Sequence, residues 1–157
     1  HKKFLGKEGS DPREQLVTQL IKDIPMNATV LAFNASFEQM VLKGLAKQFG
    51  EYRDHLLNIS KNIIDIATPF QKRYYYLPQM KGKHSIKIVL PLLVPEMAEA
   101  YKELDLVHHG GEAMQAFAIL SEIKDPENII RIRESLLEYC KIDTLAMVKI
   151  VEKLKLV

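Results

Sequence analysis

Two acidic residues, Glu38 and Asp143, fall on the apolar faces of predicted helices. At about 100° per residue, Asp143 lies within the apolar stripe of the last predicted helix, and Glu38 lies on that of an earlier one. An ionised carboxylate that faces a core is costly unless a cation or hydrogen-bond donors meet it. Hard divalent ions prefer carboxylate oxygens, and a pair of them can promote phosphodiester hydrolysis. We therefore expect Glu38 and Asp143 to bind a shared Mg²⁺ or Mn²⁺ ion.

Each acid also has a structural explanation that the sequence leaves open. Glu38 lies in the first turn of its helix, where a negative charge is favourable. Asp143 could instead pair with a buried Arg or Lys. Three histidines, His84, His108 and His109, have no partner at metal-ligand spacing, so carboxylate chemistry is favoured over a zinc site.

The elements that must position these acids alternate between helices and short apolar runs. A buried strand is predicted over residues 29–33, between two helices. Capping residues and apolar spacing predict helices over residues 12–24, 35–49, 52–59, 112–123 and from 126 almost to the end, and one that Ser85 caps and that ends at Leu93. The alternation predicts an α/β fold.

Composition limits the class of protein further. With 157 residues, 47% of them hydrophobic, the chain is expected to form a single domain over residues 1–157. The net charge of +2 means that any attraction to nucleic acid must come from local clusters. The single cysteine, Cys140, cannot form an internal disulfide, and no run approaches the roughly 18 apolar residues of a membrane span. We expect a soluble, cytoplasmic protein without a membrane partner.

The segments around the two acids resemble the DEDD exonuclease superfamily. The segment from Asn34 to Glu38 resembles the second motif of DnaQ-like and RNase D-like proteins, with Glu38 in place of the usual Asp. The segment from Tyr139 to Asp143 resembles the third motif of the tyrosine-type subgroup. The resemblance implies an RNase H-like fold with a small central sheet flanked by helices, and a two-metal 3′→5′ exonuclease that uses Mg²⁺ or Mn²⁺. In it, Glu38 and Asp143 would be metal ligands, Tyr139 would orient the attacking water, and Asn34 would hold its helix or contact substrate.

The first motif of that superfamily, Asp-x-Glu on an N-terminal strand, has no counterpart here. Asp125 and Glu127 have this spacing, but they begin the last helix and serve as a cap. By the resemblance, we expect an N-terminally truncated domain whose missing strand precedes residue 1. The alternative is a catalytically incomplete module that binds nucleic acid or another nuclease domain. Residues 33–42, 74–95 and 110–113 resemble an uncharacterised bacterial family often found after a RecB-like nuclease domain, which implies such a domain as a partner in the same polypeptide.

A substrate surface is predicted between Gln71 and Lys87. No Asp or Glu occurs from residue 66 to residue 95. The basic residues of this stretch are Lys72, Arg73, Lys81, Lys83 and Lys87, and three adjacent tyrosines begin at Tyr74. Basic groups for phosphates and aromatic rings for bases suit a single strand of DNA or RNA. The open alternative is a solvated loop whose tyrosines pack on the core. Asp65 could also face the site, but capping is the favoured role.

Overall fold

The structure is a computed structural model, and it describes residues 1–156. The chain divides into two compact units, and each is described by itself. The expected single domain over residues 1–157 stays a prediction. One unit is Pro12–Val89, which we call the contiguous unit. The other combines His1–Asp11 with the chain from Leu90 onward, and we call it the split unit.

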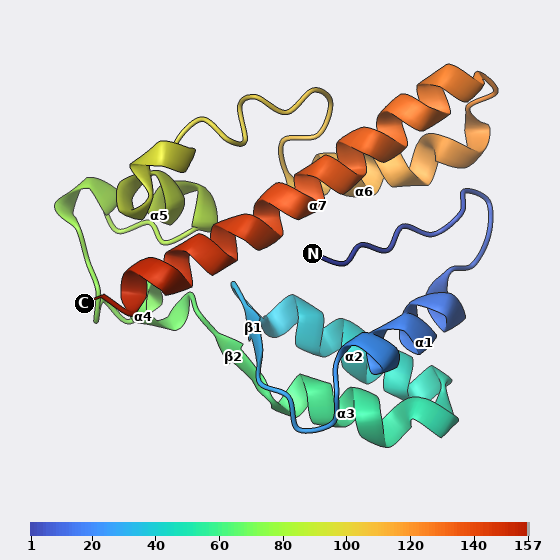
Figure 1. Cartoon of the computed structure of the whole chain (residues 1–157), viewed down its shortest axis with the longest axis horizontal. Coiled ribbons are helices and arrows are strands. Elements are labelled where there is room, and N and C mark those ends of the chain that lie inside the picture. Colours follow the sequence, from blue (N-terminus) through green and yellow to red (C-terminus); the bar gives the residue numbers. More distant parts are fainter. Residues whose placement is uncertain (157) are drawn as a thin grey trace. The chain divides into compact units, whose positions relative to one another are not determined.

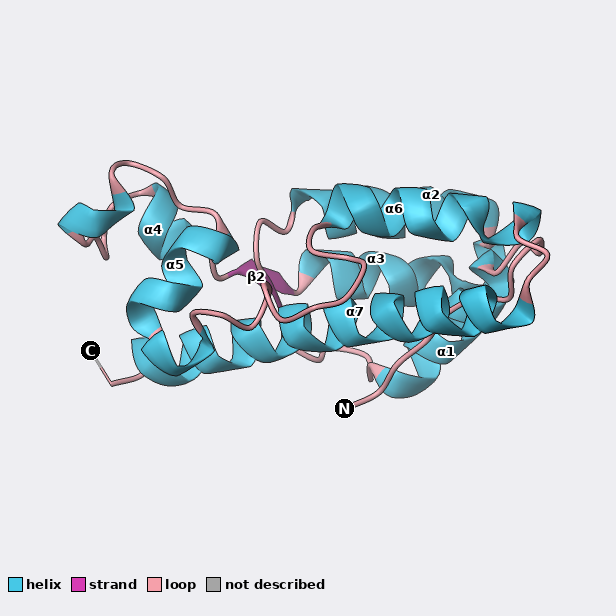
Figure 2. Ribbon diagram, turned by 90° about the horizontal axis from the view of Figure 1, so that it is seen from above, coloured by secondary structure: helices cyan, strands magenta, loops and turns pink. Residues whose placement is uncertain are grey.

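The predicted RNase H-like α/β fold, with a central sheet flanked by helices, is wrong. Helices make up 62% of the described residues, which also contain two short strands, β1 (Val30–Ala32) and β2 (Ile63–Asp65). Figure 2 shows how small this sheet is beside the helices. Apolar residues recur at helical spacing over most of the sequence, and prolines interrupt the stretch from residue 69 to residue 95, so few segments can form long strands.

The contiguous unit is a helical unit built around this strand pair. Helix α1 (Arg13–Asp23) precedes β1, and α2 (Ser36–Gln48) and α3 (Arg53–Lys61) form the connection from β1 to its parallel neighbour β2 (Figure 1). The short α4 (Thr68–Gln71), a 3₁₀ turn at Pro78–Met80 and the start of α5 (Ile86–Leu93) follow. A parallel pair needs such a long crossover connection.

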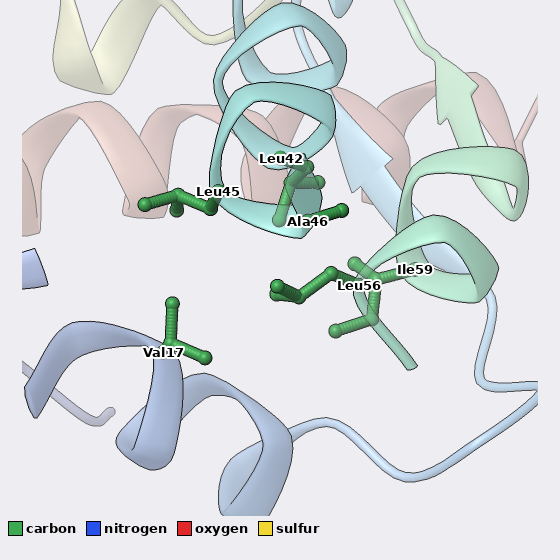
Figure 3. Packing of buried hydrophobic residues seen from close by; sticks show 6 residues of the cluster. All are labelled: Val17, Leu42, Leu45, Ala46, Leu56 and Ile59. Carbon is green, nitrogen blue, oxygen red and sulfur yellow. The ribbon is translucent and has the colours of Figure 1, made fainter. Parts of the chain in front are cut away.

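The core of the contiguous unit lies where α1, α2 and α3 meet. Its buried side chains are Val17, Leu42, Leu45, Ala46, Leu56 and Ile59, which point toward one another in Figure 3. Leu56 is fully buried at its centre, so truncating it to Ala is expected to cost about 2–5 kcal/mol of stability. These helices therefore form a rigid support for the two strands.

The split unit is organised along its longest helix, α7 (Pro126–Leu154), which Asp125 caps through a hydrogen bond from the Glu127 amide. Helix α6 (Gly110–Ile119) packs against α7 (Figure 1), and the buried side chains there are Val107, Leu120 and Leu136. Leu5 of the N-terminal segment packs on the same cluster. No helix within residues 1–156 has the length and apolar character that a bilayer crossing would require.

Candidate functional site

Asp65 joins the carboxyl ends of the two strands. Its carboxylate accepts hydrogen bonds from the backbone amides of Asn34 (2.9 Å), Ala35 (3.2 Å) and Ala67 (2.9 Å). Asn34 has a φ of 64°, in the left-handed region that Asn tolerates better than most residues. The Asn34 side chain caps no helix in the described structure. The group of Asn34 that forms a hydrogen bond is its backbone N–H, which donates to Asp65. Asp65 thus has a structural role, although it bridges two strand ends and does not cap a helix.

The basic segment, Gln71–Lys87, displays cationic and aromatic side chains together. Lys72, Arg73, Lys81 and Lys83 are all exposed. The Lys72 ammonium lies 6.0 Å from the ring centre of Tyr74, which is 77% exposed, and the Arg73 guanidinium lies 5.9 Å from that of Tyr76. These distances are within cation–π range.

The backbone and the third tyrosine show how this segment is held. Tyr75 is half-buried and packs edge-on against Phe70, with ring centres 5.8 Å apart. Arg73 and Lys81 both have positive φ angles, of 57° and 48°. Such conformations are uncommon for residues with side chains, and the surrounding structure must maintain them. Tyr75 therefore anchors the segment, while Tyr74 and Tyr76 remain exposed.

In the split unit, Asp143 is a half-buried carboxylate that accepts a hydrogen bond from a tyrosine. The Tyr101 hydroxyl donates to the Asp143 Oδ1 over 2.6 Å, and the ring centres of Tyr101 and Tyr139 lie 6.4 Å apart. Neither Lys nor Arg forms an ion pair with Asp143 in the part of the chain that the structure describes. Sequence reasoning missed Tyr101, because it lies 42 residues from Asp143 in a stretch without helical periodicity.

The two tyrosines keep their protons at neutral pH. Burial, and then the negative charge of Asp143, raise the pKa of Tyr139 to about 12. Burial and the hydrogen bond to Asp143 raise the pKa of Tyr101 well above its ordinary value. Both hydroxyls therefore act as neutral donors or acceptors. Tyr139 can orient a polar group in this way, but it is a poor base near neutrality.

Glu38 does not occupy the inward position that the helical wheel predicted. It is exposed in the first turn of α2, and the buried residues of that helix are Leu42, Leu45 and Ala46. Side chains tilt toward the N-terminus of a helix, so a first-turn residue projects beyond the packed part. Glu38 belongs to the contiguous unit and Asp143 to the split unit, so the shared ion stays a prediction. No group of three or more His, Cys, Asp or Glu side chains suitable for a metal occurs among residues 1–156.

Fold and site together define a mostly helical protein whose basic, aromatic segment and hydrogen-bonded carboxylate lie in separate units. The chain belongs to the family described as Domain of unknown function (DUF2779), whose family model matches residues 1–85. It is also 32% identical over 85 residues to "Uncharacterized protein UU173" of Ureaplasma parvum serovar 3. That alignment covers 50% of this chain but 12% of the relative. No solved structure matches the chain. The family match contains most of the basic segment and Glu38, whereas Tyr139 and Asp143 lie outside it.

Proposed function

We propose that the contiguous unit binds single-stranded nucleic acid, DNA or RNA, through the basic segment. The observation that carries the proposal is the pairing of exposed cations with exposed tyrosine rings at Lys72–Tyr74 and Arg73–Tyr76. No carboxylate occurs between residues 66 and 95 to oppose a phosphate backbone. This function corresponds to a nucleic-acid-binding module.

A single strand suits the segment better than a duplex. Tyrosine rings stack on bases only where the bases are unpaired, whereas Lys and Arg side chains contact the phosphates of either form. For single strands, each neutralised phosphate contributes about 0.7 to the slope of log affinity against log salt concentration. The five basic residues of the segment therefore set an upper limit of about 3.5 on that slope.

Charge reversal at Lys81 and Lys83 tests the proposal. The double variant K81E/K83E should weaken binding of short single strands and reduce the salt slope by about 1.4, measured by fluorescence anisotropy at several salt concentrations. A matched control, K43E/K124E, makes the same change in net charge at exposed lysines outside the segment and should bind as the unmodified protein does. Equal losses in both variants would reject the basic segment as the binding surface.

A metal-dependent 3′→5′ exonuclease is the second candidate. It is supported by Asp143, which has no cationic partner among residues 1–156. A half-buried carboxylate without such a partner can still bind Mg²⁺ or Mn²⁺. The described residues supply few ligands, so this chain alone should degrade single strands little or not at all, whereas a longer version that supplies an upstream Asp-x-Glu motif should be active. Asp143→Asn should abolish that activity. Degradation by the short chain, unaffected by Asp143→Asn, would reject the catalytic assignment.

The setting of the protein is also part of the proposal. A cytoplasmic location is consistent with the single, exposed Cys140, which has no cysteine partner in the chain. A RecB-like nuclease domain in the same polypeptide would give a binding module a substrate to hold. The Ureaplasma relative is much longer than its matched segment, so in that protein the matched segment is part of a larger chain.

A further inference from the structure

A pocket in the contiguous unit lies between the carboxyl end of β1 and the two ends of the basic segment. Its volume is about 330 Å³, and it is lined by Phe33, Asn34, Gln71, His84, Ser85 and Ile86. Ligand sites range from about 300 to 1,000 Å³, so this pocket suits a small ligand. The carboxyl ends of parallel strands are a common position for such sites.

Four of the six lining residues have polar side chains, and none of the six is a carboxylate, lysine or arginine. The side chains of Asn34, Gln71, His84 and Ser85 form no hydrogen bond within residues 1–156, so their polar atoms are available to a ligand. Amide groups both donate and accept, as the edges of nucleobases do. The lining therefore favours a ligand that has hydrogen-bonding edges and no charge.

The remaining lining residues offer faces for a flat ring. Phe33 stacks with the buried Phe70, with ring centres 6.3 Å apart and planes at 23°, so its orientation is fixed. Ile86 adds an aliphatic surface at the start of α5. Stacking on an aromatic ring is the main way in which proteins hold unpaired bases.

The charged groups lie next to the lining in the sequence and not within it. Lys72 follows Gln71, Lys83 precedes His84, and Lys87 follows Ile86. A nucleotide divides in the same way, into a neutral base and an anionic phosphate. We infer that the pocket receives one unpaired base of a single strand whose phosphates contact the basic segment. This inference rests on the proposed function and assigns a second contact to it.

Comparison of two oligonucleotides tests the pocket separately from the basic segment. The probes are a short single strand and a strand of equal length in which abasic sites replace the bases. The unmodified chain should bind the first more tightly. N34G and Q71A should each weaken binding of the first strand about 3- to 10-fold, as expected for a lost hydrogen bond, and leave the abasic strand unchanged. Glycine readily adopts the left-handed backbone conformation of Asn34, so Asn34→Gly removes the side-chain carboxamide without adding strain.

The control is Q79A, which removes an exposed amide in the basic segment that does not line the pocket. It should bind both strands as the unmodified chain does. If N34G and Q71A bind the base-containing strand normally, or lose both strands equally, the pocket inference is overturned while strand binding by the segment stands. If unmodified chain binds neither strand, the proposed function and the pocket inference both fail.

Discussion

At the scale of single residues, Asp143 shows what a helical wheel can and cannot predict about a side chain. Its place on the apolar stripe of α7 correctly predicted a half-buried carboxylate, because helical periodicity is a local property. Its partner could not be predicted, since the Tyr101 hydroxyl comes from an irregular segment far away in the sequence. The prediction that Glu38 faces inward was wrong for a different reason. The wheel gives the direction of a side chain around the helix axis, but not whether another element covers that turn.

The tyrosine beside Asp143 should make the split unit sensitive to alkaline pH. The pKa of Tyr139 is raised to about 12 in the folded chain, against an ordinary value of 10.0. The folded state therefore favours the protonated phenol. This contribution to stability is complete below about pH 10 and is lost as the pH rises toward about 12. Denaturant unfolding followed across this range should show the decline.

Asp143→Asn separates the two causes of that shift. Removing the negative charge should lower the pKa of Tyr139 below about 12, yet leave it above 10.0 because burial is the larger cause. Ring-carbon NMR titration of Tyr139 in the unmodified chain and in the variant measures this. An unchanged Tyr139 titration would show that the carboxylate charge does not reach the ring.

At the scale of elements, the sequence predicted the helices and the strand at residues 29–33, which is observed as β1, but not the small extent of the sheet. The helices expected at residues 12–24, 35–49 and 52–59 are observed as α1, α2 and α3 with ends shifted by one or two residues. Caps and apolar spacing are local signals, so helices can be predicted from them without knowledge of tertiary contacts. Pairing of strands depends on contacts distant in sequence, and the resemblance to an RNase H-like fold implied a larger sheet than residues 1–156 form.

The strand pair should depend strongly on Asp65. Asp65→Ala removes one carboxylate and leaves the amides of Asn34, Ala35 and Ala67 without their acceptor, which should cost the contiguous unit about 2–3 kcal/mol. Amide hydrogen exchange at Ala35 and Ala67 should accelerate accordingly. The control Asp54→Ala removes an exposed acid from the first turn of α3 and should change stability by less than about 1 kcal/mol. Unaltered exchange at Ala35 would mean that α2 holds this turn without Asp65.

At the scale of the whole molecule, Arg133 fixes the N-terminal segment within the split unit. Its guanidinium donates to the backbone oxygens of Leu5 (3.2 Å) and Gly6 (2.8 Å) and to the Glu8 carboxylate (2.9 Å). Arg133→Ala should release this segment, so trypsin should cleave after Lys7 several-fold faster, as followed by mass spectrometry.

The neighbouring Arg131 offers a matched control. It forms a bidentate ion pair with Asp105, on an exposed surface of the same unit. Such surface pairs contribute little to stability. Arg131→Ala should therefore leave cleavage after Lys7 unchanged. Similar acceleration in both variants would indicate general loosening of α7 and would contradict a specific role for Arg133.

The division of the chain has a consequence for the order of events during synthesis on the ribosome. The contiguous unit is complete once Val89 has emerged, so it can fold while the remainder is still being translated. Residues 1–11 emerge before the contiguous unit, yet they belong to the other unit and must wait for Arg133 before they can be held. This segment is thus synthesised before the contiguous unit but reaches its final place after it.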